Sequence, residues 1–250
     1  MRAMKRSTRP TPLRPPSSTG CSAVAAAISK TCCSLAALSA TATPTSTPPC
    51  SPLSPALDKL YTSPLPIVGI ANAHPAIPCV VVDDADGSRQ IAAHLVRRGH
   101  RRILYRTHRE RRTSVQRRLE AFCAAAGDHA MTVAVSQTDD DHRLTEAEIE
   151  MLTAARDRRP TAVVCWMDLC AHAVIAQCEA LGLQVPADVA VVGFDGVPPV
   201  LPPARTLTTV SAPWTEVAMA AVDHLLALLR GDKAPPETVL PVTLHVGDTA

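Results

Sequence analysis

The chain has 250 residues, of which 46% are hydrophobic and 19% charged, so its composition is that of a globular protein. Its formal net charge of +2 is too small to indicate nucleic-acid binding through overall electrostatic attraction. Only 2% of the residues are aromatic, which argues against a surface that stacks single-stranded bases. No apolar run reaches the roughly 18 residues of a membrane span, so no membrane partner is expected.

The first 56 residues differ in composition from the rest of the chain. They contain no Asp, Glu or aromatic residue and are rich in Pro, Ser and Thr. Such a segment cannot bury enough apolar surface to offset the entropy lost on ordering, so residues 1–56 are predicted to be disordered. Three origins are open: an export signal, an organellar transit peptide, or a misread segment that is not evolved protein, and we favour the third.

From Leu57 onward, short apolar runs alternate with amphipathic segments. Strands are expected at 66–70, 79–82, 103–105, 131–135, 161–166, 189–194 and 239–246. Helices, bounded by glycines or capping residues, are expected at 86–98, 114–126, 145–156, 169–181 and 215–230. This alternation with short connections predicts an α/β fold in which helices cover both faces of a mainly parallel sheet.

The nine cysteines form no CxxC pair and show no metal-ligand spacing with histidine. Neither His108-Arg109-Glu110 nor the acidic run that ends at His142 has a second ligand cluster at a defined spacing, so no metal is expected. Five cysteines lie inside apolar patterns, where cysteine behaves as a small hydrophobe: Cys79, Cys123, Cys165, Cys170 and Cys178. Reduced thiols of this kind indicate a cytoplasmic protein.

The strand expected at 189–194 ends in Gly-Phe and is followed by Asp195, which places this carboxylate at the carboxyl edge of the parallel sheet. Open α/β sheets bind their ligands at that edge. The chain has no Gly-x-Ser-x-Gly elbow, no P-loop and no GxGxxG motif after a strand. These features predict a small-molecule sensor that is not an enzyme and uses no cofactor.

Arginines at 97, 98, 101 and 102, and those from Arg106 to Arg112, form a conspicuous basic run. Few aromatic residues accompany them, so they are predicted to form a solvated face rather than a nucleic-acid site. His94 is expected on the polar face of its helix, and His100 at the turn after Gly99, both with structural roles.

The order of several motifs resembles the effector-sensing core of LacI/GalR-type bacterial transcriptional regulators. The motifs extend from Leu57 to about Val246, at 86–87, 94–103, 118–122, 160–165, 168–171, 182–195, 207–210, 213 and 219–229. The resemblance implies a periplasmic-binding-protein-like type I fold with two parallel-sheet lobes joined by a three-strand hinge. Lobe 1 would comprise 57–82 and 214–241, and lobe 2 would comprise 83–211 and 242–250.

Residues 1–56 show no counterpart of the family's helix-turn-helix or of the first strands and helices of its amino-terminal lobe. The sequence therefore predicts an incomplete amino-terminal lobe, and operator DNA as a partner only if a helix-turn-helix is supplied upstream.

The resemblance also implies ligand-binding residues. Arg118 would hold ligand hydroxyls or carboxylates, Asp195 would accept from sugar hydroxyls or base nitrogens, and Trp214 would pack against the ligand. Met167 and Asp168 complete the set, although the family commonly has Asn at Met167, so one hydrogen bond is missing there. The alternatives are structural: a solvated Arg118, a turn carboxylate at Asp195, a Trp214 that staples its helix, and an Asp168 N-cap, which we favour at that position.

The expected function is that of the effector-binding domain of a cytoplasmic, homodimeric transcriptional regulator that binds a sugar-like small polar molecule between its lobes. Two alternatives remain open. One is an exported solute (sugar)-binding protein, and the other is a non-functional truncated regulator fragment.

Overall fold

A computed structural model describes residues 64–110, 112–139, 141–198 and 205–250. The fold described below is that of the compact unit Ser63–Ala250. The predictions for residues 1–56, and for the first residues of the expected 57–250 domain, lie outside the described residues.

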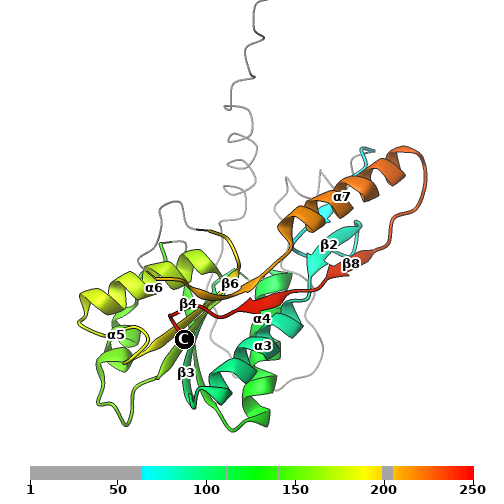
Figure 1. The fold of residues 1–250 in the computed structure, drawn as a ribbon. Helices are drawn as coiled ribbons and strands as arrows, with labels where there is room; N and C mark the ends of the chain where they lie inside the picture. Colours follow the sequence, from blue (N-terminus) through cyan, green and yellow to red (C-terminus); the bar gives the residue numbers. More distant parts are fainter. Residues whose placement is uncertain (1–63, 111, 140, 199–204) are drawn as a thin grey trace, which may run out of the picture. The chain divides into compact units, whose positions relative to one another are not determined.

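A six-stranded sheet forms the larger part of this unit (Figure 1). Its strands follow the order β4 (Thr132–Thr138), β3 (Arg102–His108), β5 (Ala162–Cys165), β6 (Ala190–Asp195), β7 (Thr208–Ser211) and β9 (Thr243–His245). All neighbours pair in parallel except β9, which is antiparallel to β7. The parallel strands therefore bring their carboxyl ends to one edge of the sheet and their amino ends to the other.

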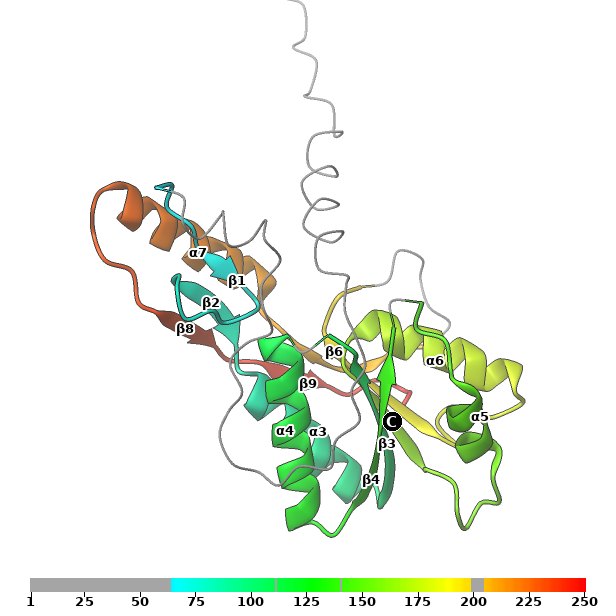
Figure 2. The ribbon, with the colours of Figure 1, turned by 180° about the vertical axis from the view of Figure 1, so that it is seen from behind.

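Helices cover both faces of this sheet, as Figures 1 and 2 show, with α3 (Asp84–Arg97) and α4 (Thr113–Asp128) on one face and α5 (Glu146–Thr153) and α6 (Asp168–Ala180) on the other. Side chains along each strand alternate between the faces. Tyr105 and Val164 pack in the core with α3 and α4, whereas Leu104 and Val163 pack in the core with α5 and α6. Burial on both faces explains the continuous apolar runs and confirms the predicted α/β architecture.

A smaller parallel sheet has the order β1 (Gly69–Ile70), β2 (Cys79–Val82) and β8 (Glu237–Leu240), and helix α7 (Trp214–Leu229) packs against it. The chain passes between the two sheets at 82–84, 211–214 and 240–243. The amide of Asp83 donates to the carbonyl of Leu240 at 2.9 Å, which joins the first and third of these connections. No helix of the described residues combines the length and apolarity needed to cross a membrane.

Two expectations about secondary structure and exposure are wrong. The single strand expected at 239–246 is divided between β8 and β9, which belong to different sheets, and Pro241 at the break has no amide to donate. His94, expected on a polar face, is buried, and burial lowers the pKa of its ring.

Arg106 also departs from the solvated face predicted for its run, because its side chain is fully buried within β3. Its Nε donates to Oε1 of Glu148 at 2.7 Å, and its other nitrogens donate to the carbonyls of His142 and Arg143. Glu148 in turn completes a capping box with Thr145 at the start of α5. Arg106 thus fastens α5 and the loop before it to the sheet.

Candidate functional site

Asp195 is the last residue of β6 and lies at the carboxyl edge of the large sheet. Its backbone has a φ of +110°, a left-handed conformation that is strained for any residue except glycine. Gly196 follows with a φ of +67°, and a side chain there would collide with Ser211. Strain of this kind is concentrated at functional sites, so it marks Asp195 as a candidate functional residue.

Arg118 projects from α4 toward this carboxylate and is only 4% exposed. Its Nη1 lies 2.9 Å from Oδ1 of Asp195, and its Nε lies 2.7 Å from Oδ1 of Asp84. Nη1 also donates to the carbonyl of Trp166 at 2.7 Å, and the guanidinium lies 3.7 Å from the centroid of the Phe194 ring. Arg118 is therefore a buried ion-pair partner of Asp84 and Asp195 and not a solvated helix residue.

Asp84 is a member of this cluster that the sequence analysis did not assign. It is the first residue of α3 and is 2% exposed. The neighbouring Asp83 caps α3 by accepting from the amide of Asp86, which leaves the Asp84 carboxylate to turn inward to Arg118. Its Oδ2 is buried and has no hydrogen-bond partner among the described residues. The sequence offers one signal for this role, since the acidic pair Asp83-Asp84 directly follows the buried strand β2.

Burial and the guanidinium act in opposite directions on these carboxylates. Desolvation raises the pKa of both Asp84 and Asp195, while the nearby Arg118 charge works to lower it. Two carboxylates against one guanidinium leave an excess negative charge when both acids are ionised. The cluster is therefore suited to accept hydrogen bonds from hydroxyl or amine donors rather than to hold a free anion.

Asp168 does not cap α6, so that prediction is wrong. Met167 occupies the N-cap position, and its side chain makes no capping hydrogen bond. The Asp168 carboxylate instead accepts from Oγ1 of Thr209 at 2.5 Å and from the amide of Val197 at 2.8 Å. A side chain at Gly193 would collide with this carboxylate, so only glycine allows the approach. Burial raises the pKa of Asp168 to about 7.

Trp214 begins α7 and its indole Nε1 donates to the carbonyl of Asp195 at 2.8 Å. Three of the five predicted site residues, Arg118, Asp195 and Trp214, are thus connected by direct bonds. Met167 is partly buried against the core beneath α6, and Asp168 bonds to β7 and the segment after β6. No hydrogen bond or ion pair joins these two residues to Arg118 or Asp195 within the described ranges.

Comparisons with known proteins place these features in a family. Residues 92–250 match the family of periplasmic binding protein-like domains. The chain is 32% identical to the arabinose metabolism transcriptional repressor of Geobacillus stearothermophilus, over 61% of this chain and 43% of the repressor. It is 34% identical to the HTH-type transcriptional regulator MalR of Streptomyces coelicolor, over 69% of this chain and 52% of MalR.

Among solved structures, a LacI transcriptional regulator from a Rhodococcus species matches with a TM-score of 0.67 and 32% identity, over 77% of this chain and 72% of that one. The chain spans about half the length of the curated relatives that it matches. These relatives are regulators and not enzymes, which agrees with the prediction that the chain is not an enzyme. The predicted fold and family resemblance are confirmed: the chain belongs to the periplasmic binding protein-like family, as an effector-sensing domain of the LacI/GalR type.

Proposed function

We propose that this chain is the sensing domain of a transcriptional regulator and binds a neutral, sugar-like effector at the carboxyl edge of its large sheet. The observation that carries the proposal is the buried Arg118–Asp195 pair at the end of β6, with Asp195 held in a strained conformation. Strain and buried charge together indicate a position kept for ligand contact rather than for stability alone.

The polar contacts are assigned to Asp195 and Arg118. The Asp195 side chain is 14% exposed, which leaves room for one edge of the carboxylate to meet a ligand hydroxyl, while Arg118 holds the other edge. Trp214 supplies an indole ring whose position is tied to Asp195, and rings of this type pack on the apolar faces of sugars. Met167 and Asp168, at the start of α6, are proposed to line the outer side of the effector site.

In the intact regulator, ligand binding would change operator affinity through coupling between two distinct sites. We propose a homodimer as the working unit, and operator DNA as a partner only where a helix-turn-helix is supplied upstream. All five cysteines of the described ranges are free, which suits a reducing, cytoplasmic compartment better than export as a solute-binding protein.

The test is a calorimetric screen of neutral monosaccharides, followed by site variants with the best ligand. Asp195→Asn should weaken binding about thirtyfold, the equivalent of roughly 2 kcal/mol for a buried charged hydrogen bond. The matched control is Asp223→Asn, on the exposed side of α7, which should bind as the parent does. Equal affinity in Asp195→Asn and the parent chain, with both variants folded by circular dichroism, would refute the site.

A further inference from the structure

A polar pocket lies at the amino edge of the large sheet, where the strands begin. It has a volume of about 200 Å³. Segments that lead into three strands line it: His100 lies before β3, Thr161 before β5 and Asp188 before β6. Arg98, Arg156 and Arg159 supply most of its charged groups.

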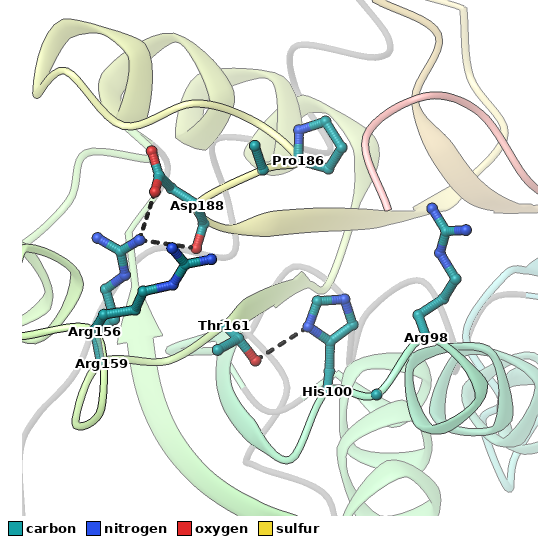
Figure 3. A pocket seen from close by; sticks show the side chains of 9 residues that line it. Arg98, His100, Arg156, Arg159, Thr161, Pro186 and Asp188 are labelled. Atoms are coloured by element: carbon teal, nitrogen blue, oxygen red, sulfur yellow. Dashed lines mark hydrogen bonds and ion pairs between the residues drawn. The ribbon is translucent and has the colours of Figure 1, made fainter.

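The pocket has an excess of positive charge, because three guanidinium groups face a single carboxylate. Arg159 pairs with Asp188 at 2.7 Å, so one arginine is neutralised. Arg98 and Arg156 form no ion pair with any residue that the structure describes. Figure 3 shows Arg98 on one side of the opening and Arg156 and Arg159 on the other, with His100 and Thr161 between them.

Several contacts hold this arrangement in place. Arg102 donates to the carbonyls of Arg159 and Arg156 at 2.9 and 3.0 Å, which fixes the backbone of the loop that carries both arginines. The His100 ring is held by a 3.1 Å contact between its Nδ1 and Oγ1 of Thr161. The Nε of Arg159 is buried and has no acceptor among the described residues. A buried donor of this kind requires an acceptor from a bound water or ligand, since the described residues supply none.

We propose that this pocket binds the phosphate group of a small phosphate monoester. Two N–H groups of one guanidinium can donate to two oxygens of the same phosphate. A phosphate dianion would also balance the charges of Arg98 and Arg156, which have no carboxylate partner among the described residues. A phosphate in the pocket would lie in the field of both Arg98 and Arg156, and Pro186 and Ala187 line the pocket with apolar atoms that could contact the organic part. The site is on the other edge of the sheet from Asp195, so it is independent of the proposed effector site.

The first experiment titrates the full chain with inorganic phosphate and with phenyl phosphate at constant ionic strength, followed by calorimetry and by the His100 ring signals in NMR. Burial and the charge of Arg98 lower the pKa of His100, and a bound dianion should raise it. Saturable binding with perturbed His100 signals is expected for both probes. Chloride should produce neither effect at the same ionic strength, because it lacks the charge and the paired oxygens.

Variants then locate the site. Arg98→Gln and Arg156→Gln should each weaken phenyl phosphate binding about tenfold, as expected for loss of one charged contact. The matched control is Arg143→Gln, whose side chain is 83% exposed and lies outside the pocket, and it should bind as the parent chain does.

Three results would overturn the proposal: no saturable phosphate binding, equal effects of chloride, or equal weakening by Arg143→Gln. Binding of inorganic phosphate without phenyl phosphate would remove the monoester assignment. Tighter binding to short duplex DNA, with loss of phenyl phosphate competition, would replace it by a nucleic-acid backbone.

Discussion

The two edges of the large sheet carry similar residue types in opposite physical states. At the carboxyl edge, Arg118 is buried between Asp84 and Asp195 with contacts of 2.7 and 2.9 Å. At the amino edge, Arg159 meets Asp188 at 2.7 Å, but the two side chains are 12% and 30% exposed. Arg98 and Arg156 beside them form no ion pair with the described residues. The same ion-pair chemistry is therefore desolvated at one edge and partly hydrated at the other.

The difference shows that burial decides what an ion pair does. A desolvated pair is costly to break, because the remaining charge has no water to stabilise it. A hydrated pair contributes little to stability, but its charges remain available to a ligand. Stability measurements should thus separate the two edges, and the variant with the largest expected loss comes first.

The largest effect is expected from Arg118→Ala, which leaves two buried carboxylates without their cation. We expect the free energy of unfolding to fall by about 3–5 kcal/mol. The counterpart at the amino edge, Arg98→Ala, should change it by less than about 0.5 kcal/mol because the side chain is exposed. Urea unfolding of both variants measures the contrast, and similar losses in the two would remove the distinction between the edges.

Replacing a glycine by alanine should lower the free energy of unfolding near the carboxyl edge and raise it near the amino edge. Gly193→Ala near the carboxyl edge drives a methyl group into the Asp168 carboxylate and Leu207, and should destabilise by about 1–3 kcal/mol. Gly127→Ala near the end of α4 meets open space and should stabilise by about 0.5–1 kcal/mol through helix propensity. Thermal melts suffice for this pair. A stable Gly193→Ala would mean that the Asp168 contact is looser than described.

The pH dependence of stability should also be opposite at the two edges. The folded-state pKa of Asp168 is raised from 3.8 to about 7, so the folded chain binds the proton more tightly and stability falls as pH rises between these values. Asp84 and Asp195 act in the same direction. Hydrogen bonding from the Gln184 amide and then from Arg159 lowers the pKa of Asp188, so its contribution is lost as pH falls.

Replacing Asp168 by Asn should reduce the fall in the free energy of unfolding between pH 4 and pH 8 by on the order of 3 kcal/mol. Asp188→Asn should leave that decline in place. Urea midpoints across this pH range test both variants. An unchanged slope in Asp168→Asn would show that its carboxyl does not titrate within the range.

A small effect is expected from Arg117→Gln, next to the buried cluster. Arg117 joins α4 to β8 through Glu237 at 2.6 and 3.0 Å, close to the buried cluster but with side chains that are 38% and 32% exposed. Despite its good geometry, this pair should contribute at most about 0.5–1 kcal/mol, and less at high salt. A loss as large as that of Arg118→Ala would show that position, not burial, sets the value of these pairs.

Local pattern was sufficient to predict most of the architecture. Strands buried on both faces read as continuous apolar runs, so β3, β5 and β6 were recognisable from their own residues. Family resemblance brought Arg118 and Asp195 into one site hypothesis, and the structure joins them directly.

The errors arose where a partner comes from far along the chain. Arg106 lies in a basic run that suggests solvent, but its acid is 42 residues away on α5. Asp84 meets Arg118 from 34 residues away, across α3 and β3. Only the packing of the helices onto the sheet determines such pairs, and no local periodicity reports it.

The placement of the two tryptophans has a spectroscopic consequence. They are the only ones in the chain. The carbonyl of Trp166 accepts from Arg118, and its ring lies 5.0 Å from that of His108. The indole of Trp214 is bonded to the backbone of Asp195. The Trp214 indole therefore emits from beside Asp195, whereas the Trp166 indole emits from its contacts with His108 and His142. A ligand that reaches Asp195 should change the first emission, and a Trp166→Phe variant would leave Trp214 as the single reporter of that site.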